Sequence, residues 1–80
     1  MKQLDVHGLT LEEAISTINK NIKIAYDNHI SVLYVCHGFN KGDKIKAWCL
    51  KHGSGSPYVS KVESGINEGI SNFYIKVKIR

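Results

Sequence analysis

The first part of the chain has the hydrophobic pattern of a strand followed by an amphipathic helix. A short candidate strand, residues 4–7, ends at Gly8, a residue type that tolerates the positive φ of a turn. Thr10 and Glu13 have the spacing of a capping box, and we expect the helix that follows to end near Asp27 and Asn28. Its apolar residues recur at three- and four-residue steps: Leu11, Ala14, Ile15, Ile18, Ile22, Ala25 and Tyr26.

A second strand and a second helix are predicted next. Residues 31–36 include an unbroken apolar run, which is typical of a central strand buried on both faces. Strand, helix and strand in this order form a βαβ unit with parallel strands. A turn-rich loop, residues 37–42, leads into a helix that we expect Gly53 to cap. One face of this helix carries Ile45, Trp48, Cys49 and His52.

The last part of the chain predicts two more strands. Residues 58–62 form one, residues 64–72 a loose loop, and residues 73–80 alternate strictly between apolar and polar. We expect Phe73, Ile75, Val77 and Ile79 to face the core, and Tyr74, Lys76, Lys78 and Arg80 to face outward. The order β-α-β-α-β-β predicts an α/β (α+β) two-layer sandwich, with two helices on one face of a mixed sheet. One domain spanning residues 1–80 is expected.

Composition and charge narrow the classes of function. A chain that is 42% hydrophobic and 22% charged is not a disordered segment. No apolar run approaches the ~20 residues of a membrane span, and residues 1–3 lead straight into the first strand, so we expect a cytoplasmic protein with no membrane partner. The net charge of +4 is uneven, with −1 on residues 1–35 and +5 on residues 36–80. A basic half favours DNA or RNA as partner, although solubility explains it too.

Three side chains near the predicted strand ends are candidates for acid–base chemistry. Asp5 and His7 are two residues apart, so they lie on the same side of a strand, where the carboxylate orients the imidazole. His37 ends the second strand as His7 ends the first. If both rings flank one phosphodiester, they act as base and acid in RNA cleavage, whereas DNA cleavage requires activated water, for which a bound metal helps. In the alternative interpretation, Asp5 accepts turn amides and His7 is structural.

The loop after the second strand is a candidate anion site. It brings backbone amides to a helix N-terminus beside lysines, through Gly38, Asn40, Lys41, Gly42 and Lys44. The alternative is that the glycines serve only turn geometry and that the lysines are solvated. The pattern of a Walker sequence is missing, so we expect no nucleotide cofactor.

Two further groups of residues have competing interpretations. Lys76 and Lys78, with Tyr74 and Arg80, form a basic stripe that suits nucleic-acid backbone contacts, although lysines on an edge strand also discourage aggregation. Cys36 and Cys49 are expected to stay reduced. A zinc site from these thiols with His37 and His52 is disfavoured, because no Cys-x2-Cys pair exists and Cys36 is expected to point into the core.

The motifs resemble those of a known family. Leu4-Asp5-Val6-His7-Gly8 resembles the Leu-Asp-x-His-Gly signature that opens Smr (small MutS-related) domains, and residues 10–14 resemble the start of their first helix. His37-Gly38-Phe39-Asn40 stands where their His/Thr-Gly-x-Gly motif follows the second strand, with Asn40 at the place of the second glycine. The element order agrees, and the resemblance covers essentially the whole chain.

The resemblance implies a fold and an activity. The fold would be similar to the C-terminal domain of translation initiation factor three. Smr domains bind nucleic acid, and several nick DNA or cleave RNA. By this resemblance, Asp5 and His7 match the positions implicated in cleavage, and His37, Gly38 and the loop match the second motif. Many members are fused to other domains, so a fusion or partner domain is part of this expectation.

Three functions remain open at this point. The preferred hypothesis is a nucleic-acid-binding domain with DNA-nicking or RNA endonuclease activity, in which Lys41 and Lys44 hold phosphate and a divalent ion, Mg²⁺ or Mn²⁺, is an optional cofactor. The first alternative is a non-catalytic module that binds DNA or RNA structure. The second is a protein-interaction domain whose basic half only solubilises it.

Overall fold

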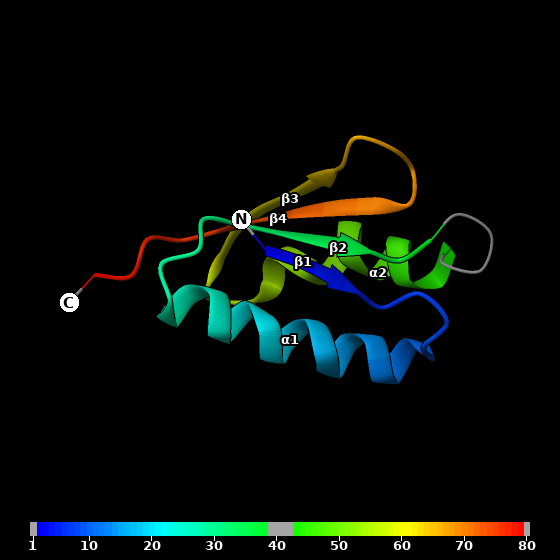
Figure 1. Ribbon diagram of the computed structural model, residues 1–80, viewed down its shortest axis with the longest axis horizontal. Coiled ribbons are helices and arrows are strands. Elements are labelled where there is room, and N and C mark those ends of the chain that lie inside the picture. The colour runs from blue at the N-terminus through cyan, green and yellow to red at the C-terminus, as the bar shows by residue number, and fades with distance from the viewer. Residues whose placement is uncertain (1, 39–42, 80) are drawn as a thin grey trace.

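The computed structural model describes residues 2–38 and 43–79, and it has the predicted order of elements. These elements are β1 (Lys2–Asp5), α1 (Leu11–Asp27), β2 (Val32–Cys36), α2 (Asp43–His52), a 3-10 turn at Gly53–Gly55, β3 (Val59–Ser64) and β4 (Ile70–Ile75). The predicted two-layer fold is confirmed: a four-stranded mixed sheet with both helices packed on one of its faces (Figure 1).

The sheet has the strand order β1-β2-β4-β3. β1 runs parallel to β2, with Asp5 opposite Cys36, while β4 runs antiparallel to both β2 and β3. β2 is therefore central, as predicted, and its carboxyl end lies beside that of β1. Its burial on both faces is not observed, because the helices cover one face only: Leu33 and Val35 are buried, whereas Val32, Tyr34 and Cys36 are half-buried.

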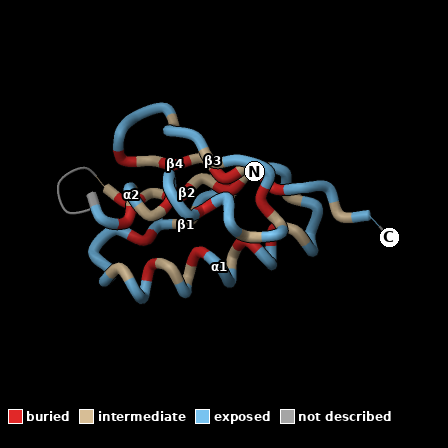
Figure 2. Tube along the Cα trace, turned by 180° about the vertical axis from the view of Figure 1, so that it is seen from behind, coloured by how far each residue is buried: buried red, intermediate tan, exposed pale blue. Residues whose placement is uncertain are grey.

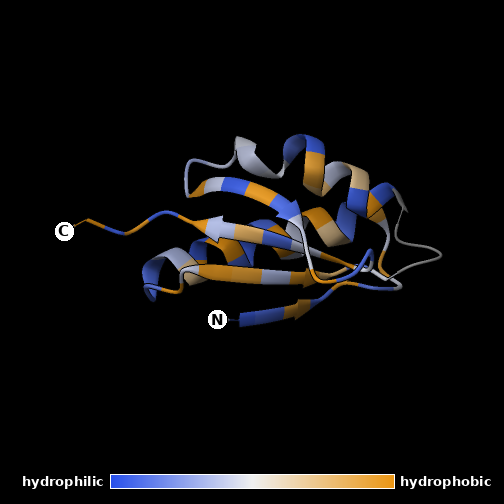
Figure 3. Cartoon of the chain, turned by 90° about the horizontal axis from the view of Figure 1, so that it is seen from above, coloured by the Kyte–Doolittle hydropathy of each residue, from blue (hydrophilic) through white to orange (hydrophobic). Residues whose placement is uncertain are grey.

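The core fills the layer between the helices and the sheet. The buried side of α1 faces the sheet (Figure 2), and both helices alternate between apolar and polar residues along their length (Figure 3). The capping box predicted for α1 is present, because the Glu13 amide donates to Thr10 Oγ1 at 3.2 Å and the Thr10 amide to Glu13 Oε1 at 3.0 Å. The buried core comprises Val6, Ala14, Ile18, Ile22, Ala25, Leu33, Val35, Ile45, Cys49, Val59, Phe73 and Ile75.

The prediction for the last strand is wrong at both ends. β4 begins at Ile70, inside the expected loose loop, and ends at Ile75, while β3 extends to Ser64. Val77 and Ile79 do not face the core but are 81% and 86% exposed. Alternation of residue types predicts a strand only where a partner strand supplies hydrogen bonds, and β2 and β3 pair with β4 no further than Ile75.

Glycine is required at position 53 for a reason other than the helix cap that was predicted. Its φ is not in the left-handed region, so it does not cap α2 as a left-handed residue. A Cβ at this position would lie 2.7 Å from Cε2 of Phe73, so glycine is required by close packing under that ring. On α2, Ile45 and Cys49 are buried and Trp48 is half-buried, but His52 is exposed, which leaves it off the buried face.

Candidate functional site

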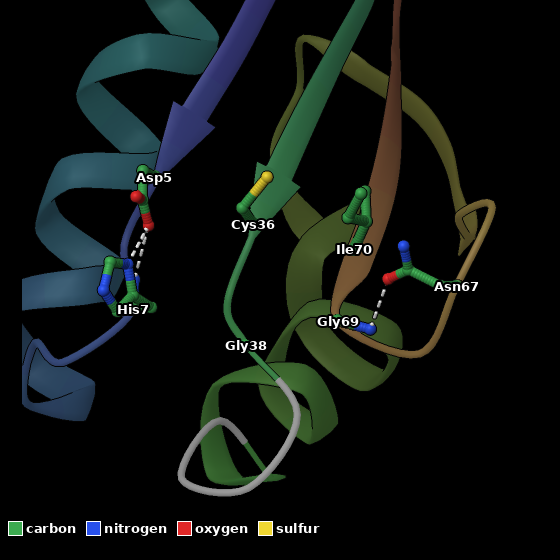
Figure 4. Close-up of a pocket in the computed structure, with 7 residues that line it drawn as sticks. All are labelled: Asp5, His7, Cys36, Gly38, Asn67, Gly69 and Ile70. Atoms are coloured by element: carbon green, nitrogen blue, oxygen red, sulfur yellow. Dashed lines mark hydrogen bonds and ion pairs between the residues drawn. The ribbon is translucent and has the colours of Figure 1, made fainter.

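A cavity of about 250 Å³ opens where the carboxyl ends of β1 and β2 meet the start of β4. Its lining residues come from three segments of the chain, and Figure 4 shows them around the opening: Asp5, His7, Cys36, Gly38, Asn67, Gly69 and Ile70. The carboxyl ends of parallel strands are where open α/β sheets place ligands. The cavity is therefore the candidate site, and it contains both members of the predicted Asp–His pair.

Asp5 and His7 form a hydrogen-bonded dyad. The Asp5 carboxylate accepts from Nδ1 of the His7 ring at 2.5 Å and from the His7 backbone amide at 3.0 Å. These two bonds to His7 hold the pKa of Asp5 below its ordinary value. Both side chains remain accessible, at 61% and 70% exposed. The carboxylate thus fixes the ring by Nδ1 and leaves Nε2 as the acceptor of the neutral imidazole.

A tight turn places this dyad at the rim of the cavity. The Leu9 amide donates to the Val6 carbonyl at 3.2 Å, and Gly8, the third residue of the turn, has a φ of 82°. A positive φ at the third position defines a type II turn when the second residue, here His7, has a negative one. Gly38 at the end of β2 has a φ of 84°, and a Cβ on it would lie 3.5 Å from the Cβ of His7.

His37 is not brought together with His7. Its ring is 1% exposed and lies in the core layer, where Nε2 and the hydroxyl of Ser71 are 2.9 Å apart. Nδ1 is 3.2 Å from the Gly38 carbonyl, which only accepts, so Nδ1 carries the proton and the Ser71 hydroxyl donates to Nε2. Burial lowers the pKa of His37, and the charge of Lys46 lowers it further. The ring ties β2 to β4 and does not line the cavity.

Sequence reasoning missed the turn between β3 and β4, which forms the far wall of the cavity. The Gly69 carbonyl accepts from the amides of His37 and Gly38 at 2.9 and 3.2 Å, and the Gly69 amide donates to Asn67 Oδ1 at 2.9 Å. This bond fixes the Asn67 carboxamide beside the opening (Figure 4). Asn67-Glu68-Gly69 has the composition of a turn, but only the β4 register shows that the turn reaches β2.

The predicted basic residues do not form one group. Lys44 is exposed in the first turn of α2, which follows the loop from the cavity, whereas Lys76 and Lys78 lie beyond β4 at the opposite end of the sheet (Figure 1). Lys78 contacts Asp27 at 3.2 Å, and Lys23 shares that carboxylate at 2.7 Å, so together they lower its pKa. The edge-strand interpretation is wrong, because β4 is central. Asn40, Lys41, Gly42 and Arg80 lie outside the described residues.

The two thiols have different surroundings. Cys49 is in the core, and its burial raises the pKa of the thiol to about 12. Cys36 is half-buried and lines the cavity (Figure 4), so the expectation that it points into the core is wrong. Within residues 2–38 and 44–79, no three His, Cys, Asp or Glu side chains are gathered as metal ligands. In the same ranges, no helix is long and apolar enough to cross a bilayer.

Comparison with solved structures identifies the class of fold. The crystal structure of the Smr domain of Thermus thermophilus MutS2 matches with a TM-score of 0.87 at 19% sequence identity, over 95% of this chain and 99% of that one. No curated protein matches the sequence. The family model described as the Smr domain matches residues 4–77. The chain therefore belongs to the Smr domain family, as its motifs predicted.

Proposed function

We propose that this domain binds nucleic acid at the strand-end cavity and cleaves a phosphodiester bond there. Membership of the Smr family, which is associated with nucleic-acid binding and nicking, supports the substrate class. The observation that carries the chemistry is the Asp5–His7 dyad, in which a carboxylate holds one nitrogen of an accessible imidazole and leaves the other able to take a proton.

In the proposed mechanism, His7 is the general base and Asp5 is its positioning residue. With RNA, Nε2 takes the proton of a 2′-hydroxyl, the 2′-oxygen bonds to phosphorus and the bond to the 5′-oxygen breaks. The products are a 2′,3′-cyclic phosphate and a 5′-hydroxyl, whose proton comes from solvent. With DNA, Nε2 takes a proton from a water molecule, the water oxygen bonds to phosphorus, one P–O ester bond breaks, and the departing oxygen takes a proton from solvent.

Phosphate would be held by the loop after β2 and the start of α2. Gly38 lines the cavity at the start of this loop, and Lys44 contributes a cation near the N-terminal end of α2, which also favours anions. Asn40, Lys41 and Gly42 belong to the same proposal on the basis of sequence. Lys76 and Lys78 lie beyond the other end of β4, too far away to bind the same phosphate. Any contact that they make is to a distant part of the bound nucleic acid.

His37 is proposed as a positioning residue. Its buried ring and its bond to Ser71 hold the end of β2, from which Gly38 approaches His7. The two-histidine pair expected from sequence is replaced in this proposal by a single exposed base.

The described donors fit a divalent metal poorly. One carboxylate, Asp5, lines the cavity among the described residues, and it is already bonded to His7. Mg²⁺ prefers several oxygen ligands. No step of the proposal uses a metal, and the experiment below includes a chelator to test that choice.

The test is a cleavage assay with supercoiled plasmid and with a structured RNA, each in Mg²⁺, Mn²⁺ or EDTA. His7→Ala is expected to lose roughly 100- to 10,000-fold in rate while remaining folded. The matched control is His52→Ala, which removes another exposed histidine outside the cavity. Equal cleavage by His7→Ala and the unmodified chain would overturn the role of the dyad.

A non-catalytic binding module is the second candidate. The observation in its favour is the high exposure of both dyad side chains, because catalytic electrostatics are strongest in sites that exclude water. This alternative predicts salt-sensitive binding of DNA or RNA that survives His7→Ala, with no cleavage under any metal condition.

A further inference from the structure

The sheet face opposite the helices, here termed the open face, has no covering layer in the described structure (Figure 1). Side chains alternate along each strand, so the pairing register defines its members: Gln3, Asp5, Val32, Tyr34, Cys36, Lys61, Glu63, Ile70, Asn72 and Tyr74. Asp5 belongs to this set, so the dyad and the open face are parts of one surface.

A second hollow lies on the open face, next to the cavity of the dyad. Its volume is about 240 Å³, and its lining consists of Gln3, Tyr34, Ile66, Ile70 and Asn72. Ile70 lines both hollows, so a ligand can extend from one into the other without leaving the surface. The lining combines apolar side chains with two carboxamides and one phenol ring, which suits a flat heterocycle with polar edges.

Two aromatic rings stand on the central strands of this face. Tyr34 pairs with Asn72 and Val32 pairs with Tyr74, so the two tyrosines are diagonal neighbours on β2 and β4. The ammonium of Lys61 lies 4.9 Å from the centroid of the Tyr74 ring. The other two tyrosines, Tyr26 and Tyr58, lie off this face and pack against each other, with ring centroids 4.6 Å apart and ring planes tilted by 41°. Aromatic side chains on the open face of a four-stranded sheet are a common base-stacking arrangement.

The β3–β4 turn brings an apolar side chain to the rim of the hollow. A Cβ on Gly65 would lie 2.8 Å from Cγ2 of Ile70 and 2.9 Å from Oδ1 of Asn72, so glycine lets the turn pack on the sheet. Ile66, the next residue, is 95% exposed and lines the hollow. Within the described residues, Oδ1 of Asn72 is buried beneath this turn without a hydrogen-bond partner.

We propose that the open face binds unpaired bases of a single-stranded nucleic acid, one of which stacks on Tyr34 and another against Ile66. The adjoining phosphate then lies at the Asp5–His7 cavity. A duplex buries the faces of its bases, so the platform selects single strands or unpaired loops. This inference rests on the proposed function for the class of ligand and adds which form of nucleic acid is bound and where.

The test measures affinity for two labelled strands of equal length in EDTA: oligothymidylate and an abasic deoxyribose-phosphate strand. The unmodified chain is expected to prefer oligothymidylate. Tyr34→Leu should lower that affinity roughly 5- to 100-fold and leave the affinity for the abasic strand unchanged. Tyr34→Phe retains the ring and should bind as the unmodified chain does.

Ile66→Ala gives a second test at a residue that the fold does not need. We expect a smaller loss that is again confined to oligothymidylate. Ile24→Ala is its matched control, because Ile24 is an exposed isoleucine on α1, in the other layer. Thermal unfolding of each variant establishes that it is folded.

The outcomes separate this inference from the proposed function. Equal affinity for both strands would overturn the stacking platform and leave phosphate binding intact. Binding of neither strand would overturn the platform, and it would overturn the proposed function as well if plasmid and structured RNA also remain uncleaved. Base-dependent binding without cleavage would support the platform and reject the nuclease. A concentration-dependent dimer that Ile66→Ala dissolves, with no binding of oligothymidylate, would assign the open face to a second copy of the chain and overturn the platform.

Discussion

His7 and His37 follow neighbouring parallel strands, and each precedes a glycine with a φ of 82° or 84°, yet their rings lie in opposite surroundings. The His7 ring is accessible and bonded to a carboxylate, whereas the His37 ring is buried and bonded to a hydroxyl. The same dipeptide therefore supplies an accessible imidazole in one place and a buried, hydrogen-bonded one in the other.

The register of the two strands explains the difference. Asp5 pairs with Cys36, so the continuation of that register sets His7 opposite Gly38, and His37 opposite the buried Val6. Side chains alternate between the two faces of a sheet, and a shift of one residue exchanges the faces. His7 shares the open face with Asp5, while His37 shares the helix-covered face with the core.

Alanine substitution of the two histidines should separate these roles most strongly. His37→Ala removes a buried ring and leaves the Ser71 hydroxyl without its partner, so we expect a loss of about 2–4 kcal/mol in the free energy of unfolding. His7→Ala should change it by no more than about 0.5 kcal/mol. Urea titrations followed by circular dichroism measure both, and equal losses would contradict the comparison.

Substitution of the dyad carboxylate should affect rate without affecting stability. Asp5→Asn replaces the acceptor that fixes the His7 ring with a carboxamide, and we expect cleavage to slow roughly 10- to 100-fold. The measurement is the single-turnover rate at substrate saturation. Glu12→Gln is a matched control, because Glu12 is an exposed carboxylate of α1 that lines neither the cavity nor the open face. A rate for Asp5→Asn equal to that of the control would show that the carboxylate does not position the base.

Substitution of either strand-end glycine should strain the backbone. Gly8→Ala and Gly38→Ala each place a Cβ on a left-handed residue, at a cost of about 1–2 kcal/mol. Space around Gly8 is open, so its loss of stability comes from the backbone alone. Thermal unfolding of both variants measures the cost, and an unchanged melting temperature would show that these residues leave the left-handed region at no cost.

The smallest expected effect is on how the free energy of unfolding depends on pH in the unmodified chain and in His37→Gln. Burial lowers the pKa of His37 below its ordinary value of 6.5, so below that pH the unfolded chain binds a proton that the folded chain does not. Stability therefore falls as pH decreases from about 6.5 toward the lowered pKa. His37→Gln removes this contribution, and the difference in unfolding free energy between the unmodified chain and the variant should narrow on acidification. A difference that widens would mean that His37 is protonated in the folded state.

The sequence predicted the local features of the fold more successfully than the non-local ones. The capping box at Thr10, the apolar face of α1 and the central position of β2 depend on residues near in sequence, and all are confirmed. The end of β4 and the exposure of Val77 and Ile79 depend on where partner strands stop. Alternation alone does not contain that information.

The same limit applies to the candidate site, whose local contacts were predictable and whose contacts between segments were not. Asp5 and His7 are close in sequence, so their pairing follows from strand geometry, and the structure brings them together. The placement of His37 required the β1–β2 register, and the contribution of Asn67 required the approach of the β3–β4 turn to β2. Neither contact has a signal within a single segment of the chain.

The most direct test of the central claim compares single-turnover cleavage by His7→Ala and His37→Gln with that of the unmodified chain. Rates are corrected for the folded fraction measured by circular dichroism under the same conditions. We expect a loss of roughly 100-fold or more for folded His7→Ala, and a corrected rate for His37→Gln within about 10-fold of the unmodified chain. Full activity of His7→Ala, or complete loss of activity in folded His37→Gln, would contradict the central claim.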